Sequence, residues 1–111
     1  MTLEISFADK LLRQLCENEA IAKRKLGTKV AEKLKRRLAD LRAATCIKDL
    51  ATVRPYELEG IHQKQIALDL CDDYRIVLCA NHNSVPLLDS GAIDWSMVNR
   101  VKILRIEGTH D

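Results

Sequence analysis

Several side chains in the second half of the chain belong to the types that can cleave a phosphodiester bond through a neighbouring ribose 2′-hydroxyl. That reaction needs a base for the hydroxyl, a cation for the charge that develops on the phosphate, and an acid for the leaving 5′-oxygen. His62 or His110, Arg75, and Tyr56 or Lys64 could supply such a set. The set requires no metal ion and no organic cofactor, and no cluster of carboxylates indicates a metal site.

Arg75 is central to this hypothesis, and it also has a plainer interpretation. A guanidinium held on a sheet suits the bidentate recognition of a phosphate. The same side chain could instead pair with Asp69 or Glu57, a surface contact that stabilises a protein little. The spacing of these residues leaves both interpretations open. A histidine in a loop is often only solvated, so the histidines alone do not establish a nucleolytic site.

The four cysteines, Cys16, Cys46, Cys71 and Cys79, form no Cys-x-x-Cys pair, and no histidine lies at ligand spacing beside two of them. This pattern argues against a zinc site. Because the N-terminus shows no secretory signal, the sequence predicts four reduced, mostly buried thiols in a cytoplasmic protein rather than two disulfides. No stretch approaches the roughly 20 apolar residues that span a membrane.

The charges of the chain are unevenly distributed. Residues 1–55 hold 13 basic and 7 acidic residues, a net charge of +6, whereas residues 56–111 hold 5 and 9, a net charge of −4. The overall charge of +2 hides this difference. Such asymmetry favours contact with a polyanion through the first half. With 47% apolar residues in 111, the chain is expected to fold as one small domain over residues 1–111.

The elements that must position these residues begin with a strand and two helices. Apolar and polar residues alternate over residues 1–7, which predicts a short, half-buried strand. Asp9 can cap a first helix, which is expected to bend near residues 17–20 and to stop by Gly27. A second helix begins at Thr28, so the two form a helical hairpin.

The second helix has an apolar stripe and a strongly basic outer surface. Val30, Leu34, Leu38 and Leu41 recur at helical spacing over about four turns. Basic residues occupy much of the remainder: Lys29, Lys33, Lys35, Arg36, Arg37 and Arg42. Such residues often only solvate a helix, but the excess here favours a phosphate-rich partner. The candidates for RNA binding are Lys29, Lys33, Arg36 and Arg37, together with Lys64.

After Pro55 the apolar pattern alternates, which predicts four strands. They are expected over residues 56–59, 65–71, 74–80 and 100–107. A three-residue loop or a bulge must place Leu70 opposite Tyr74, because only that register gathers the apolar side chains on one face. Arg75 then points to the other face. The predicted fold is α+β in the order β-α-α-β-β-β-β, a mostly antiparallel sheet with a helical hairpin on one face and the opposite face open.

Several segments together resemble the RelE/ParE toxin superfamily, most closely its HigB-type, or plasmid maintenance killer, branch. The resemblance rests on residues 56–60 (YELEG), 65–70 (QIALDL), 73–77 (DYRIV) and 93–96 (IDWS), then on residues 101–107 and the terminal His110. It covers essentially the whole chain and includes the first strand and the second helix. No single motif is specific by itself; the ordered combination is.

The resemblance implies the toxin of a type II toxin–antitoxin module. Members of this family bind the ribosomal decoding site and cut messenger RNA there, and an antitoxin with a helix-turn-helix domain neutralises them. Contact with operator DNA is then expected only through the antitoxin, and no membrane is involved. The family's strand arginine falls on Arg75 and its terminal histidine on His110. Tyr56 and His62 stand where relatives often carry other groups, so the resemblance implies a catalytic set rearranged around Tyr56, His62, Arg75 and His110.

Two other functions remain open at this point. The chain could be a non-catalytic inhibitor of the ParE kind, whose targets include DNA gyrase. It could also be a detoxified relative that is kept for antitoxin binding and operon regulation.

Overall fold

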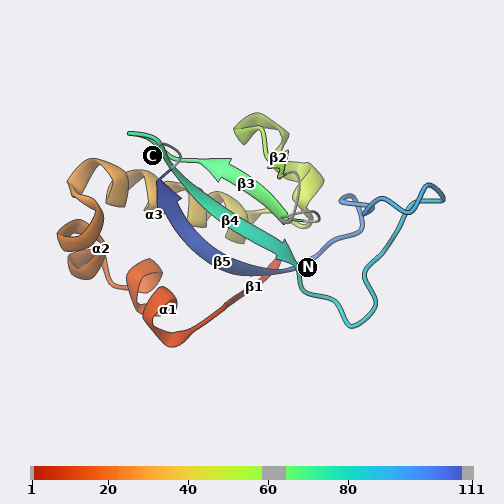
Figure 1. The fold of residues 1–111 in the computed structure, drawn as a ribbon, viewed down its shortest axis with the longest axis horizontal. Coiled ribbons are helices and arrows are strands. Elements are labelled where there is room, and N and C mark those ends of the chain that lie inside the picture. The colour runs from red at the N-terminus through yellow and green to blue at the C-terminus, as the bar shows by residue number, and fades with distance from the viewer. Residues whose placement is uncertain (1, 59–64, 109–111) are drawn as a thin grey trace.

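A computed structural model describes residues 2–58 and 65–108 of the chain. The first half carries strand β1 and three α-helices, one more than predicted, and the second half carries the four predicted strands (Figure 1). The elements are β1 (Glu4–Phe7), α1 (Lys10–Glu17), α2 (Glu19–Leu26), α3 (Thr28–Ala43), the 3-10 helix η1 (Ile47–Val53), β2 (Tyr56–Glu57), β3 (Gln65–Asp69), β4 (Tyr74–Ala80) and β5 (Arg100–Gly108). The fold is α+β.

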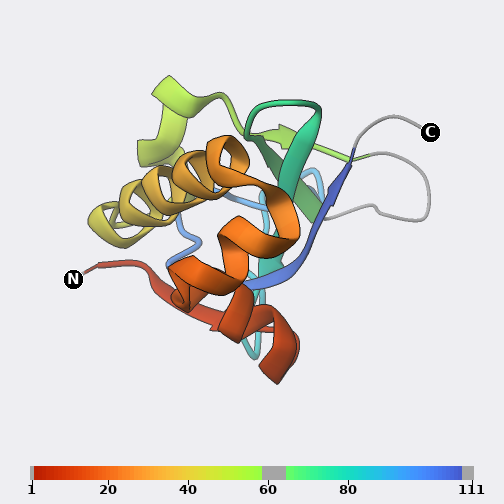
Figure 2. The same cartoon turned by 90° about the vertical axis from the view of Figure 1, so that its left-hand side faces the viewer.

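The strands form one open, mostly antiparallel sheet in the order β1-β5-β4-β3-β2. β1 runs parallel to β5, and the remaining neighbours are antiparallel. All three α-helices lie on one side of the sheet (Figure 2). The other face, called the open face below, is not covered by any helix in the part of the chain that the structure describes.

The core lies between α3 and the covered face of the sheet. Leu34, Leu38 and Leu41 of α3 are almost fully buried. They belong to the same cluster as the inward side chains of the middle strands, namely Ile66, Leu68, Ile76, Leu78, Val101 and Ile103. Ile66 lies opposite Leu78 and Leu68 opposite Ile76, so the apolar residues of β3 and β4 meet on one face. The apolar stripe of the predicted second helix is thus confirmed as its buried side.

The predicted first helix is in fact two helices, α1 and α2, divided at Asn18. Asn18 has an extended backbone, and its side-chain Oδ1 accepts the N–H of Ile21 at 3.1 Å while its own N–H donates to Gln14 O at 2.8 Å. Asn18 therefore ends one helix and caps the next. Gly27, with φ of 89°, makes the turn into α3, as predicted. None of these helices has the length and apolar character that crossing a membrane requires.

The turn between β3 and β4 has the predicted register. The N–H of Leu70 donates to the carbonyl of Tyr74 at 2.9 Å, and Asp69 lies opposite Arg75. Asp72 and Asp73 take up the left-handed conformation that the tight turn needs, with φ of 52° and 63°. Aspartate tolerates that conformation better than most residues. Leu70 thus joins the core, and Arg75 points to the open face.

A bulge in β5 changes which residues of that strand face the core. Val77 pairs with Arg105, but the next residue of β4, Leu78, pairs with Ile103, so Leu104 is left over. Without this extra residue, Arg105 would continue the inward series of Val101 and Ile103. The bulge reverses the alternation and places Arg105 on the open face.

Candidate functional site

Five polar side chains on the open face are connected by hydrogen bonds and are called the polar cluster below: Tyr56, Asp69, Arg75, Arg105 and Glu107. An ion pair between Arg75 and Glu107 lies at its centre. The two residues are register partners on β4 and β5. Both Nε and Nη2 of Arg75 donate to Glu107 Oε2, at 2.8 and 2.5 Å. The plainer interpretation, that Arg75 forms an ion pair, named the wrong partners: Glu57 lies opposite the core residue Ile66, and the side chain of Asp69 accepts the Tyr56 hydroxyl instead.

Tyr56 connects Arg75 to Asp69. Its hydroxyl donates to Asp69 Oδ1 at 3.0 Å and accepts Nη1 of Arg75 at 3.4 Å. The tyrosine reaches this position because β2 pairs with β3, with Tyr56 opposite Ala67. The structure therefore brings together two of the four predicted catalytic residues, Tyr56 and Arg75.

Arg105 completes the cluster from β5. Its Nε donates to Glu107 Oε1, so the two carboxylate oxygens of Glu107 are each held by a different arginine. All three side chains are about a quarter exposed. Sequence reasoning missed Arg105 and Glu107. With regular alternation both would have followed Val101 and Ile103 into the core, and only the bulge turns them outward.

Hydrogen bonds and charge shift the titration of this cluster. The pKa of Arg75 is raised by its hydrogen bonds to Tyr56 and to Glu107. The hydrogen bonds to Glu107 are shorter than the one to Tyr56 and join opposite charges, so they are the stronger interaction of the guanidinium. Partial burial acts to raise the pKa of Glu107, but the hydrogen bonds and charges of Arg105 and Arg75 outweigh it, and the pKa is lowered. Glu107 is thus an anion at neutral pH.

The predicted proton carriers His62 and His110 and the predicted RNA-binding Lys64 lie outside the described residues. The remaining histidine, His82, has a structural contact: its Nε2 accepts the N–H of Asn99 at 3.2 Å, which ties the start of the long loop between β4 and β5 to its end.

The predicted RNA-binding residues of α3 fall into two groups. Lys29, Lys33 and Arg36 line a shallow hollow of about 260 Å³ together with Glu32 and Cys71. Lys29 also pairs with Asp72 at 3.3 Å in the turn between β3 and β4.

Arg37 points elsewhere. It pairs with Asp40 at 3.1 Å and donates to the carbonyl oxygen of Asp69 at 3.4 Å. The side chain of Asp69 accepts a hydrogen bond from the Tyr56 hydroxyl, while its backbone carbonyl accepts one from Arg37. Asp69 therefore joins the basic helix α3 to the polar cluster. The cationic side of α3 and the open face therefore meet at the same end of β3.

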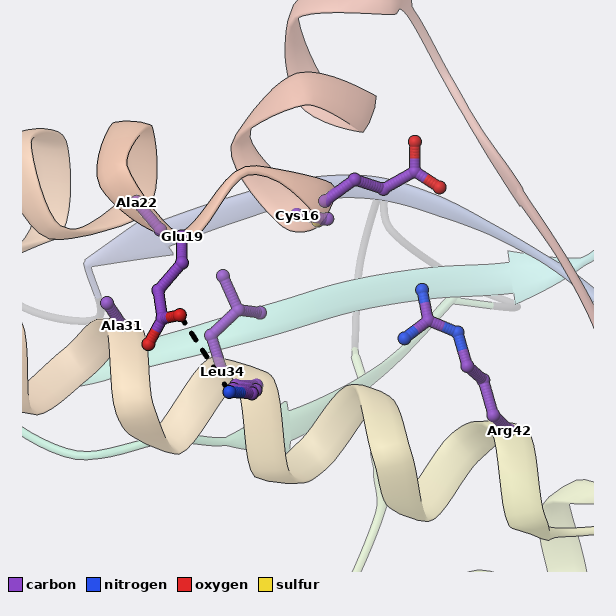
Figure 3. A pocket seen from close by; sticks show the side chains of 8 residues that line it. Cys16, Glu19, Ala22, Ala31, Leu34 and Arg42 are labelled. Atoms are coloured by element: carbon purple, nitrogen blue, oxygen red, sulfur yellow. Dashed lines mark ion pairs between the residues drawn. The ribbon is translucent and has the colours of Figure 1, made fainter.

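A second hollow, between α1, α2 and α3, has a volume of about 350 Å³ (Figure 3). Its floor is apolar, with Leu34 at the base, and its rim carries Glu19, which pairs with Lys35 at 3.8 Å. Burial raises the pKa of the Cys16 thiol in this hollow to about 11, although the nearby charge of Arg42 opposes the shift. At neutral pH Cys16 is therefore held mainly as the thiol, the less reactive form of the side chain.

All four cysteines are free, as expected. They are only partly buried, however, because each lies near the end of an element or in a loop and not in the central cluster. The prediction of mostly buried thiols was wrong in this respect.

The chain matches no protein-family model and no curated protein. Chemically, the open face offers Arg75 beside the Tyr56 hydroxyl, and Arg105 joined to Arg75 through Glu107. Guanidinium groups placed in this way suit the binding of a phosphate. Among residues 2–58 and 65–108, no three His, Cys, Asp or Glu side chains are grouped so that they could hold a metal ion.

The lowered pKa of Glu107 predicts a pH dependence of stability. A carboxyl group whose pKa is lower in the folded than in the unfolded protein stabilises the fold above its usual pKa, and this contribution is lost as the pH falls through the lowered value. We expect Glu107→Gln to remove that contribution. As the pH is lowered from neutral to below the usual carboxylate range, the free energy of unfolding of the wild type should fall. That of Glu107→Gln should fall less, because the variant has no Glu107 carboxylate to protonate. Urea denaturation at a series of pH values measures the difference, and parallel curves would contradict the assignment.

Proposed function

We propose that this protein is the toxin of a type II toxin–antitoxin module of the RelE/ParE superfamily, of the HigB type, and that it cuts messenger RNA on the ribosome. The observation that supports this most is the position of Arg75. It lies on the open face of the sheet, at the residue that the family resemblance assigns to the phosphate, and within 3.4 Å of the Tyr56 hydroxyl.

In this proposal Arg75 binds the scissile phosphate and stabilises the negative charge that grows on it during attack by the 2′-hydroxyl. A guanidinium can do so through two hydrogen bonds whose geometry matches two phosphate oxygens. His62 or His110 takes the proton from the 2′-hydroxyl. Tyr56 lies close enough to Arg75 to donate to the leaving 5′-oxygen, once its hydroxyl turns from Asp69 to the substrate.

The basic side of α3 would hold ribosomal RNA. Lys29, Lys33 and Arg36 share one hollow, and Lys33 and Arg36 form no ion pair within the described ranges 2–58 and 65–108. Contacts of this kind give affinity without sequence specificity. In the proposal Lys64 adds to this binding, and the ribosome positions the message.

The other partner in this proposal is a cognate antitoxin with a helix-turn-helix domain, through which alone the protein reaches operator DNA. The module acts in the cytoplasm and needs neither a metal ion nor an organic cofactor. The observed order of elements, β1, then the helices, then β2 to β5, supports the proposal of a RelE-like fold, for which β-α-α-β-β-β-β was predicted; the first of the two predicted helices is divided into α1 and α2.

One observation favours a second candidate, a non-catalytic inhibitor of the ParE kind. Arg75 is paired with Glu107 at 2.5 and 2.8 Å, so it is not free to bind a phosphate unless that pair opens. An inhibitor that only binds its target, for example a target such as DNA gyrase, would not need the ion pair between Arg75 and Glu107 to open.

Expression of this chain alone in a bacterial host separates the candidates. Growth would be followed, and the 5′ ends of messenger RNA would be mapped by primer extension. We expect growth arrest with new 5′ ends at defined positions. Arrest with a DNA-damage response and no new ends would favour the gyrase inhibitor. Normal growth would indicate a detoxified relative and would contradict the proposal.

A further inference from the structure

We propose that Arg75 and Arg105 together form a phosphodiester-binding site in which the carboxylate of Glu107 occupies the place of the ligand. This inference rests on the proposed function for the identity of the ligand as RNA. It adds to that function a second phosphate-binding residue, Arg105, and an internal competitor, Glu107.

The geometry of the cluster is that of an occupied anion site. The Nε of each arginine donates to a different oxygen of one carboxylate, and Arg75 adds a second donor. Two guanidiniums that converge on two oxygens of one anion would present the same donors to two oxygens of a phosphate. Arg75, Arg105 and Glu107 together carry a net charge of +1, and Asp69, which accepts a hydrogen bond from the Tyr56 hydroxyl, brings the charge of the whole cluster to zero. A net positive charge that attracts a phosphate therefore appears when Glu107 is displaced.

Arg105 has a hydrogen-bonding group that Glu107 leaves unsatisfied. Its Nη2 is buried and has no hydrogen-bond partner in the described ranges. A buried donor without a partner is unfavourable, because it has lost its water and gained nothing in return. A phosphate has more acceptor oxygens than a carboxylate and could satisfy this donor after a small rotation of the side chain.

The Glu107 contacts are also of a kind that a ligand can displace. Glu107 is 28% exposed, Arg75 21% and Arg105 31%, so water reaches all three side chains. Ion pairs with this exposure contribute little to stability. Displacement of Glu107 therefore leaves the fold intact, while Tyr56 and the β4–β5 register still hold Arg75 in position.

The test measures binding without cleavage. The probe is a fluorescently labelled single-stranded RNA with 2′-O-methyl groups, which cannot be cut through the 2′-oxygen. Glu107→Gln keeps the shape of the side chain and removes the competing charge, and we expect it to bind this RNA about three- to tenfold more tightly than the wild type. Arg105→Gln should bind it several-fold more weakly.

Glu4→Gln is the matched control for the change in net charge. Glu4 pairs with Arg100 at 3.2 Å, between β1 and β5 and away from the cluster. If Glu107→Gln gains no more affinity than Glu4→Gln, the site is not the one proposed. Thermal melting by circular dichroism verifies that each variant folds.

A measurement on the wild type does not depend on any variant. Titration with inorganic phosphate should shift the NMR signals of the Nε–H groups of Arg75 and Arg105 together, and not that of Arg100. Unchanged signals for both arginines would overturn the inference. Because neither assay involves cleavage, a protein that binds in this way but does not cut messenger RNA would refute the proposed function alone.

Discussion

Replacement of Arg75 by alanine is expected to reduce messenger-RNA cleavage about 100-fold or more and to abolish growth arrest. In the proposed mechanism this guanidinium stabilises the charge that develops on the scissile phosphate, and loss of one such donor typically lowers the rate by about 100- to 1,000-fold. The fold should survive, because Arg75 is partly exposed and its ion pair contributes about 1 kcal/mol or less. Cleavage rates and thermal melting of the same preparations give both quantities.

Two further variants make the result specific. Arg75→Lys keeps the charge but loses the paired donors, so it should fall between alanine and the wild type. Arg100→Ala removes an arginine from the same sheet, where it pairs with Glu4, and should cleave like the wild type. Full toxicity of Arg75→Ala would show that this residue does not bind the scissile phosphate.

Replacement of Leu38 by alanine is expected to lower the free energy of unfolding by about 2–5 kcal/mol. Leu38 is 1% exposed and lies between α3 and the sheet. The substitution removes apolar surface from the core and leaves a cavity, and both effects are unfavourable. A loss of this size is a large share of the roughly 5–15 kcal/mol by which a domain is usually stable. Urea denaturation followed by circular dichroism measures it.

Leu11→Ala is the matched control, because Leu11 is the same residue type in a helix but is 77% exposed. We expect its effect to be within about 0.5 kcal/mol. Equal effects of the two substitutions would mean that α3 does not pack on the sheet as described.

Patterns that repeat over several residues were predicted correctly. The stripe of Leu34, Leu38 and Leu41 identified α3 and its buried side, because a helix exposed on one face must repeat its apolar residues at that spacing. The register of Leu70 against Tyr74 followed from a similar requirement, since a shift by one residue would have exposed the apolar face of β3.

Features that depend on one residue or on tertiary context were missed. Asn18 divides the first helix through a single side-chain hydrogen bond, and asparagine in that sequence is compatible with a mere bend. The bulge at Leu104 has no signature such as a glycine, and it alone turns Arg105 and Glu107 outward. The partner of Arg75 could not be found from the sequence for the same reason: Glu107 is 32 residues away and faces it only because of the bulge.

The most direct test of the account is a reconstituted translation reaction with purified protein. Ribosomes programmed with a defined messenger RNA would be treated with the protein, and the 5′ ends of the RNA would be mapped, with the same RNA without ribosomes as the control. We expect cuts at discrete positions only when ribosomes are present, and their loss with Arg75→Ala. Intact messenger RNA at protein concentrations that arrest growth in cells would contradict the central claim that the open face around Arg75 is a ribonuclease site.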